Sequence, residues 1–369
     1  MGVHEPTVGA RVPIRRAAHR TSGIGAPAPA GRGSLYLWFP RTTQQVRALD
    51  ALREAGRFVE QFEACVRVEI RPGELDACIL DLGEALSDSE CRKARALFTS
   101  RASPPGLDDF GRIVTLHDLN VLAQTGWLLE QLEKGSITSH FHPIVHANDT
   151  SRLFAHEALL RGVDRHGVPV EPLTLLQLAR EAGLLPQVDL AACRAAIREA
   201  SRLDPDVTIF VNFSPAMLDD AESCLRATVD AIDAAGLRHD RFVFEVIEAD
   251  RISDAARLKR ILDSYRRDGF RVALDDLGAG WSTLNLVHRL RPDFIKLDRD
   301  LVREVHQDPV KDLIASKLLE IGRGLDIRTI VEGVEEPEEL RWARERGADF
   351  VQGFLIARPS ANPTLRGGG

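Results

Sequence analysis

The sequence predicts an α/β protein built around a (β/α)8 barrel, with a small α/β or α+β domain in front of it. Eight strand-like runs recur after residue 138, and helical patterns fill most of the gaps between them. Strands that alternate with helices form a largely parallel sheet, and eight such strands close into a barrel. In addition, seven of the eight runs carry a polar side chain at or near their end. The chain has 369 residues, which is long enough for a barrel and one smaller unit.

The expected barrel elements are short apolar strands and longer amphipathic helices. The strand-like runs are 141–146, 153–160, 208–213, 242–247, 272–275, 294–297, 329–332 and 350–354. The helical patterns are 173–182, 188–202, 219–235, 254–267, 310–323 and 336–346. We expect the barrel domain to extend over 138–360, followed by a short tail at 361–369.

The region before the barrel divides into a tail, a small domain and a linker. Residues 1–34 are rich in Ala, Gly, Pro and Arg without periodicity, which is typical of a disordered tail. The small domain at 35–105 is expected to have an input or dimerisation role, because it shows no metal-ligand spacing and no phosphate loop. Its expected strands are 35–39, 58–62, 64–70 and 77–82, and its expected helices are 42–56 and 87–98.

The sequence Pro104-Pro105-Gly106 marks a domain boundary, and a helical linker is expected at 106–137. Leucines recur along 116–133 with a helical period. Such a stripe is usually core packing, but it could also pair with its twin in a homodimer.

Composition limits the kind of partner and the location. The net charge is −7 and there is no Lys/Arg-rich run, so nucleic-acid binding is not expected. No apolar run is long enough to span a bilayer. The five cysteines form no Cys-x-x-Cys pair, which favours reduced thiols in a cytoplasmic protein.

The segment Arg271 to Gly280 reads Arg-Val-Ala-Leu-Asp-Asp-Leu-Gly-Ala-Gly, so two adjacent acids follow a strand. A lone Asp-Asp pair would most simply cap the next helix. Other strands also end in polar residues. Together with this pair, the set is Glu157, Asn212, Glu245, Asp275 with Asp276, Lys296, Glu332 and Gln352. Because the carboxyl ends of barrel strands share one face, this set predicts an oxygen-lined site for a divalent metal.

At these residues the chain resembles the EAL family of cyclic di-GMP phosphodiesterases. The family's naming motif is Glu157-Ala158-Leu159, followed by Leu160-Arg161. The other matching motifs, in order, are Pro143-Ile144-Val145, Asn212-Phe213-Ser214, Glu245-Val246-Ile247-Glu248, Asp275-Asp276, Lys296-Leu297-Asp298, Glu332-Gly333-Val334-Glu335, and Gln352-Gly353-Phe354 with Pro359. The resemblance covers about 139–359.

The resemblance implies a barrel whose first strand is reversed, and hydrolysis of cyclic di-GMP to linear pGpG with Mg²⁺ or Mn²⁺. It also implies a homodimer. The implied ligands of the first metal are Glu157, Asn212, Glu245 and Asp275, and those of the second include Asp275, Asp276 and Glu332. The implied catalytic residues are Lys296, Glu157, Glu332 and Asp276. The implied substrate-binding residues are Arg161, His142, Gln352 and Asp298. The implied loop-stabilising residue is Glu248.

The sequence departs from the family pattern at several positions but at no implied metal ligand. Leu277 and Ala279 replace a Phe and a Thr in the loop after the two acids, and His142 replaces a Gln. Ile247 replaces a Thr and Gly162 replaces an aromatic residue. Three functions remain open: an active phosphodiesterase, a receptor that binds cyclic di-GMP without turnover, and a different metal-dependent barrel enzyme.

Overall fold

The computed structural model describes residues 32–62, 65–100, 105–164, 167–213, 221–246, 254–278 and 283–363. Most of both predicted tails therefore lies outside the described residues. The chain forms two compact units, one of residues up to 124 with 181–183, the other of 125–180 with 184 onward. Helix α4 (Leu116–Lys134) contains the boundary between them. The domain limits expected from the sequence stay predictions.

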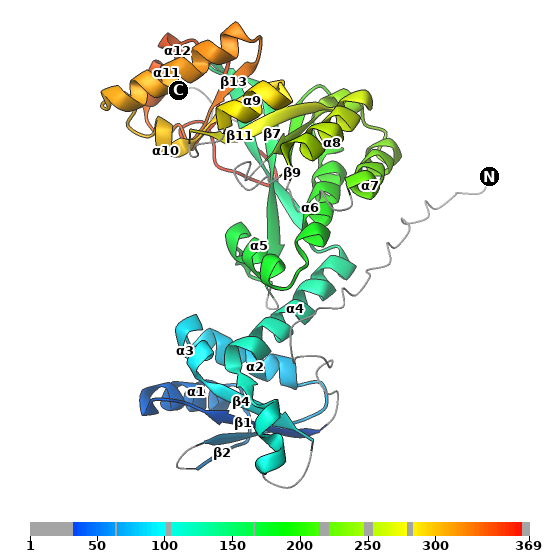
Figure 1. Ribbon diagram of the computed structural model, residues 1–369, viewed down its shortest axis with the longest axis vertical. Coiled ribbons are helices and arrows are strands. Elements are labelled where there is room, and N and C mark those ends of the chain that lie inside the picture. The colour runs from blue at the N-terminus through cyan, green and yellow to red at the C-terminus, as the bar shows by residue number, and fades with distance from the viewer. Residues whose placement is uncertain are drawn as a thin grey trace, which may run out of the picture. The chain divides into compact units, whose positions relative to one another are not determined.

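The first unit is an antiparallel sheet with helices (Figure 1). Its strand order is β2-β3-β1-β4-β5. The elements are β1 (Gly33–Trp38), α1 (Thr42–Glu54), β2 (Val59–Gln61), β3 (Val66–Ile70), α2 (Leu75–Ala85), α3 (Asp88–Lys93), β4 (Arg95–Thr99), the 3₁₀ turn η1 (Leu107–Arg112) and β5 (Val114–Thr115).

Two sequence predictions in this unit are wrong. The run 77–82, expected as a strand, belongs to helix α2, whose buried residues Leu75, Cys78, Ile79 and Leu82 follow helical spacing. The helix expected over 87–98 ends at residue 93, and strand β4 follows. β4 lies between β1 and β5, and Ala96 through Thr99 are all buried, so its apolar run lacks the alternation that marks a strand.

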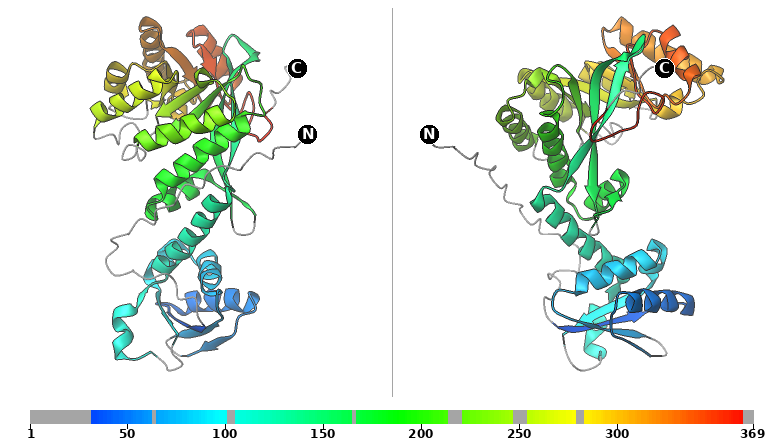
Figure 2. Two further views of the ribbon diagram at one scale, coloured as in Figure 1. Left: turned by 90° about the vertical axis from the view of Figure 1, so that its right-hand side faces the viewer. Right: turned by 180° about the vertical axis from the view of Figure 1, so that it is seen from behind.

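The second unit is the predicted barrel. Its eight strands are β6 (Thr138–His146), β7 (Asp149–Val163), β9 (Thr208–Phe213), β10 (Phe242–Val246), β11 (Arg271–Leu277), β12 (Phe294–Leu297), β13 (Arg328–Val331) and β14 (Phe350–Val351). β6 pairs antiparallel with both β7 and β14, and the neighbours from β7 and β9 through β14 are parallel. The reversed first strand is therefore confirmed, and β6 closes the barrel. Figure 2 shows the long β6–β7 pair.

Helices follow most of the barrel strands. They are α5 (Pro172–Glu181), α6 (Leu185–Ala200), α7 (Ala221–Ala234), α8 (Ala255–Arg267), α9 (Thr283–Leu290), α10 (Arg299–Val302), α11 (Pro309–Gly324) and α12 (Pro337–Glu345), with the short strand β8 (Pro169–Val170) and the 3₁₀ turn η3 (His239–Arg241). The sequence did not predict α9 and α10, which are short. None of the described helices is both long and apolar enough to cross a membrane.

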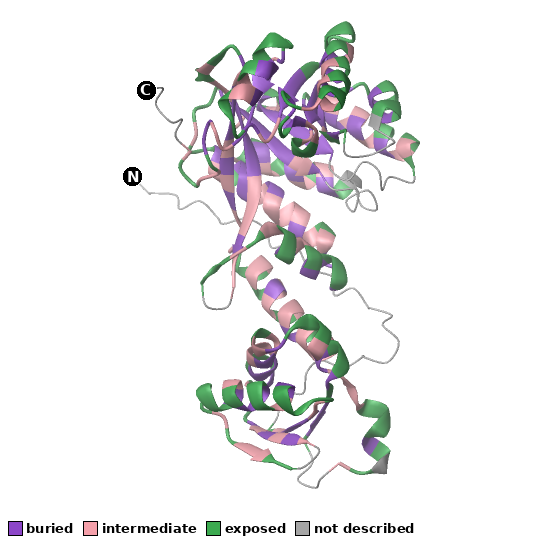
Figure 3. Cartoon of the chain, turned by 90° about the vertical axis from the view of Figure 1, so that its left-hand side faces the viewer, coloured by how far each residue is buried: buried purple, intermediate pink, exposed green. Residues whose placement is uncertain are grey.

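Successive side chains of each barrel strand point alternately toward the helices and into the barrel. Residues such as Ile209, Val211 and Phe213 belong to the large apolar core beneath the helices. The barrel interior contains a second apolar cluster with one buried residue from each strand: Ile144, Ala155, Phe210, Val243, Ala273, Phe294, Ile330 and Phe350. Figure 3 shows the buried residues concentrated on these strands. The polar residues of the barrel interior lie directly next to this apolar layer, toward the carboxyl ends of the parallel strands.

Candidate metal centre

A polar layer lies directly above the apolar layer inside the barrel. In every parallel strand and in β7, the residue two positions after the apolar-layer residue is polar. In the reversed β6, the corresponding residue is two positions earlier. Because side chains repeat with a period of two along a strand, these eight residues share the interior face. They are His142, Glu157, Asn212, Glu245, Asp275, Lys296, Glu332 and Gln352.

The ammonium group of Lys296 lies among four carboxylates of this layer. Its Nζ is 2.5 Å from Oε1 of Glu332, and 3.5 Å from both Oε2 of Glu157 and Oδ1 of Asp275. It also forms a close ion pair with Glu245. Lys296 is only 1% exposed and Glu245 is fully buried. One ammonium group therefore faces four carboxyl groups in a buried space.

The electrostatics of the layer follow from this imbalance. Burial raises the pKa of Glu245 well above its usual range, and the charge of Asp275 adds to the effect. The pKa of Glu332 is raised in the same direction, first by burial. Burial opposes the charged form of Lys296, but the surrounding carboxylates outweigh it, so the pKa of this ammonium group is raised.

The donor set fits a divalent cation. Carboxylate oxygens of Glu245, Asp275 and Glu332 lie within 4.8 Å of one another. Oε2 of Glu245 and Oε1 of Gln352 are buried and have no hydrogen-bond partner among the described residues. Hard oxygen ligands with unused lone pairs suit Mg²⁺, Mn²⁺ or Ca²⁺.

Gln352 forms a hydrogen bond with another carboxylate of the layer. Its Nε2 donates a 2.7 Å hydrogen bond to Oε2 of Glu157, and both side chains are buried. A hydrogen bond of this kind fixes the direction of a ligating carboxylate. Asn212 lies next to Glu245 in the sheet register, on the neighbouring strand β9.

Asp275 and Asp276 are adjacent near the carboxyl end of β11, and Asp276 lies beside the layer. Asp276 has a left-handed backbone with φ 55°, and its amide N–H donates to Oδ1 of Asp275 at 2.9 Å. Although Asp276 is exposed, the protein packed around its carboxyl raises its pKa to about 7, and the charges of Asp275 and Asp298 contribute. Asp298 also accepts the N–H of Asp300 at 2.8 Å and so begins α10.

Two residues predicted to bind substrate lie on the strand pair β6–β7. His142 is the register partner of Glu157, and its Nε2 lies 3.0 Å from the carbonyl oxygen of Ala357. Arg161 lies four residues beyond Glu157 on the same face of β7, half-buried, and its Nη1 donates to the carbonyl of Leu160 at 2.7 Å. Glu248, Ala279 and Gly280 lie outside the described residues.

Sequence reasoning missed Glu339, which supports the loop after Glu332. This buried residue of α12 accepts the N–H groups of Glu335 and Glu336 at 2.8 and 3.1 Å, and that of Glu304 at 3.0 Å. The signal was present, because Glu336 and Glu339 have the spacing of a capping box at a helix start.

Comparison with known proteins gives a consistent result. The model of the EAL domain family matches residues 125–359. The probable cyclic di-GMP phosphodiesterase PdeG of Escherichia coli is 29% identical over 242 residues, covering 63% of this chain and 46% of that protein. The blue light- and temperature-regulated antirepressor BluF of the same species is 28% identical over 230 residues, covering 62% of this chain and 56% of that protein.

A solved structure agrees with the fold. The standalone EAL protein of Vibrio cholerae O395, in its c-di-GMP bound form, is 29% identical with a TM-score of 0.57, covering 62% of this chain and 95% of that one. The chain spans about half the length of the two curated relatives named above.

Proposed function

Because this chain belongs to the EAL domain family over residues 125–359, we propose that it hydrolyses cyclic di-GMP to linear pGpG with divalent cations, Mg²⁺ or Mn²⁺. The observation that carries the proposal is the convergence of four carboxylates on one buried lysine at the carboxyl ends of the barrel strands. Enzymes built on this fold have their active sites at that face. The relatives named for cyclic di-GMP supply the substrate class.

Each residue of the layer has a proposed role. Glu157, Asn212, Glu245 and Asp275 would hold one cation, and Asp275, Asp276 and Glu332 would contribute to a second. When bound, such cations polarise a phosphodiester and lower the pKa of a water molecule.

The remaining groups act directly on the substrate or its water. Lys296 offers N–H donors to the attacking water and to negative charge that develops on the phosphate. Arg161 has the planar guanidinium suited to a phosphate, and its half-buried position four residues beyond Glu157 on the same face of β7 would orient the dinucleotide. His142, Gln352 and Asp298 would complete the substrate contacts, and Glu248 would stabilise a loop.

The test is product formation. Purified protein is incubated with cyclic di-GMP and Mg²⁺ or Mn²⁺, and pGpG is measured by chromatography. We expect turnover in the native protein, and loss of turnover in Glu157→Ala and Lys296→Ala. Near-normal turnover in either variant would refute the role of that residue.

The second candidate is a receptor that binds cyclic di-GMP without turnover. Two observations support this candidate: the similarity to the antirepressor BluF, and Leu277, the last residue of β11, which stands where the family pattern has a Phe. Saturable binding of cyclic di-GMP without pGpG, at any metal concentration tested, would support the receptor and refute the enzyme.

The predicted homodimer and cytoplasmic location stay predictions. On α4, whose leucine stripe led to the dimer prediction, Leu122 is exposed. Sedimentation of native protein and of Leu122→Ser would test whether that stripe pairs.

A further inference from the structure

A cavity lies at the end of the barrel where the parallel strands begin, opposite the polar layer. It encloses about 730 Å³, and its wall includes the first residues of three strands, Arg271, Phe294 and Arg328. The loops that lead into β12 and β13 supply Arg291 and Asp326. The polar layer lies at the other ends of the same strands, so this cavity is separate from the proposed metal centre.

Aromatic rings form the inner wall of this cavity. Phe154 is an extra residue in β7, because the pairing of β6 with β7 skips from Ala155 to Leu153. A bulge of this kind redirects a side chain. The ring of Phe154 stacks on Phe350 with centroids 3.8 Å apart, and lies 5.7 Å from Phe294. Phe154 and Phe294 both line the cavity; Phe294 is 3% exposed, so the half-buried Phe154 offers more of the apolar surface.

Three arginines of the wall retain unused hydrogen-bonding capacity. Nη2 of Arg271 donates to Oγ1 of Thr208 at 3.0 Å and to the carbonyl of Asp240 at 2.8 Å, whereas its Nε is buried and has no hydrogen-bond partner among the described residues. Its guanidinium lies over the Phe294 ring at 5.4 Å. Arg328 donates to Asp349 through Nε at 2.9 Å and lies over the ring of Phe350. Within the described part of the chain, Arg291 has no ion-pair partner.

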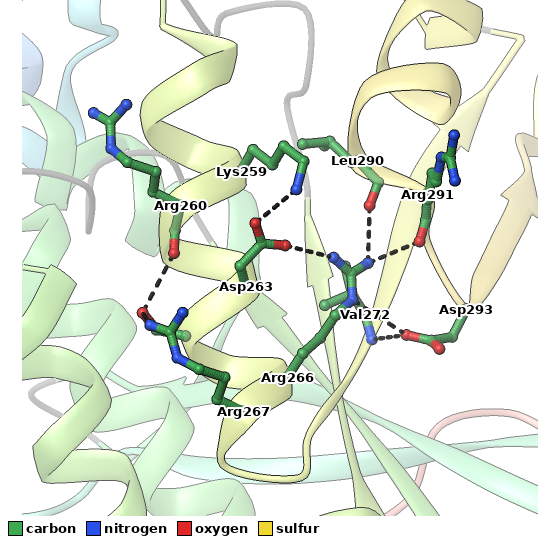
Figure 4. A network of polar contacts seen from close by, with 10 residues as sticks. Lys259, Arg260, Asp263, Arg266, Arg267, Val272, Leu290, Arg291 and Asp293 are labelled. Carbon is green, nitrogen blue, oxygen red and sulfur yellow. Dashed lines mark hydrogen bonds and ion pairs between the residues drawn. The ribbon is translucent and has the colours of Figure 1, made fainter.

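The backbone at Arg291 is unusual for an arginine. Its φ is 43°, and that of Asp326 is 58°, so both residues occupy the left-handed region that glycine adopts most easily. Arg266 holds this turn by donating to the carbonyls of Leu290 and Arg291, each at 2.9 Å. Figure 4 shows the carbonyl of Arg291 directed at Arg266 and its guanidinium directed away from it. Arg291 follows the end of α9 and Asp326 that of α11, where a left-handed residue commonly terminates a helix.

The charges define the ligand. Asp293 is occupied, since its Oδ2 accepts the N–H of Val272 at 2.8 Å and lies 4.0 Å from Nε of Arg266. Asp326 has no cation partner among the residues that the structure describes, and it offers an acceptor for N–H donors. A matching ligand carries an anionic group for the arginines, a planar ring for the phenylalanines, and N–H donors for Asp326.

We propose that this cavity binds a nucleoside monophosphate. The phosphate would contact Arg291 and Arg271, and the base would lie along the wall formed by Phe154 and Phe294. A cavity of about 730 Å³ is within the usual size range of small-molecule sites.

Binding of GMP and AMP to the full chain is measured by calorimetry in EDTA, so that the metal centre does not bind nucleotide through a cation. Inorganic phosphate and guanosine are the partial probes. We expect saturable binding of at least one mononucleotide, and weaker binding of both partial probes. Arg291→Gln should weaken binding by about tenfold or more, because a charge-assisted contact is lost. Arg289→Gln, an exposed arginine of α9 that does not line the cavity, is the matched control.

Two further variants remove the remaining ambiguities. Arg291→Gly should weaken binding as much as Arg291→Gln, while leaving the urea midpoint equal to or above that of the native protein, because glycine adopts positive φ without steric cost. Arg161→Ala should leave mononucleotide binding unchanged. Absence of saturable binding by both mononucleotides would overturn the proposal. So would equal losses in Arg291→Gln and Arg289→Gln, or loss of binding in Arg161→Ala.

Discussion

Replacement of Lys296 by methionine tests the electrostatic account of the polar layer. Methionine has nearly the same length and volume, so the variant removes the charge and leaves the packing almost unchanged. In the native protein each carboxylate at 3.5 Å attracts the ammonium group by about 5 kcal/mol at an effective dielectric constant near 20. The cost of burying the charges offsets most of that attraction, and removal of one partner from a buried ion pair typically costs about 3–5 kcal/mol.

We therefore expect the free energy of unfolding of Lys296→Met, in EDTA near neutral pH, to fall by about 3–5 kcal/mol. The pKa of Lys296 is raised in the folded state, so its stabilisation is fully present below the usual pKa of lysine and is lost only as pH rises through the folded value. The difference in the free energy of unfolding between native protein and Lys296→Met should become smaller as pH falls. Glu245 and Glu332, whose pKa values are raised, then take up protons and no longer need the positive charge of Lys296.

The assay is urea unfolding followed by circular dichroism at several pH values, with and without Mg²⁺. Added Mg²⁺ should restore part of the lost stability, since a bound cation replaces the missing charge. Lys317→Met is the control, because Lys317 is exposed and its pair with Glu320 is at the surface. A loss of stability no larger than in this control would refute the account.

Three further predictions concern other parts of the barrel. Gln352→Leu removes the hydrogen bond to Glu157, and we expect about a 10–100-fold loss of metal affinity or of activity, measured by metal titration and pGpG formation; unchanged values would show that Gln352 does not orient Glu157. Phe210→Ala opens a cavity in the apolar layer and should cost about 3–5 kcal/mol in urea unfolding, whereas a cost under about 1 kcal/mol would mean that the layer collapses to fill the space. In metal-free protein, Asp276 should lower stability as pH rises from about 4 to about 7, because its folded pKa exceeds the unfolded value and the folded state holds the extra proton. Asp276→Asn should abolish this slope, and an identical slope in both proteins would contradict the assignment.

The barrel was predictable from the sequence because its signals are local and repeated. Strands such as 208–213 and 242–247 are apolar runs bounded by helical patterns, and each places one polar residue near the end of the strand. Each of those polar residues lies two positions along its strand from a residue of the apolar layer. Because side chains alternate between the two faces of a strand, this spacing brings the polar residues into one layer.

Other features depend on tertiary context that a single sequence does not display. Strand β4 is buried on both sides, so its apolar run could not be distinguished from a helix. Glu339 accepts a hydrogen bond from the backbone of Glu304, which is 35 residues earlier in the sequence. No local sequence pattern predicts that these two residues are in contact. The ion pairs of Lys296 depend on side-chain placement, which the motif series indicates only in outline.

The reversed strand β6 has a consequence for how this unit is made. Its partners are β7, which follows at once, and β14, whose Phe350 pairs with His146 across about two hundred residues. Until the ribosome has released that last strand, β6 keeps one unpaired edge and the polar layer lacks Gln352. Closure must therefore wait for the synthesis of β14, which slows folding because long-range pairing carries a large entropic cost. A chain interrupted before residue 350 would retain every acid of the polar layer and still be unable to enclose them.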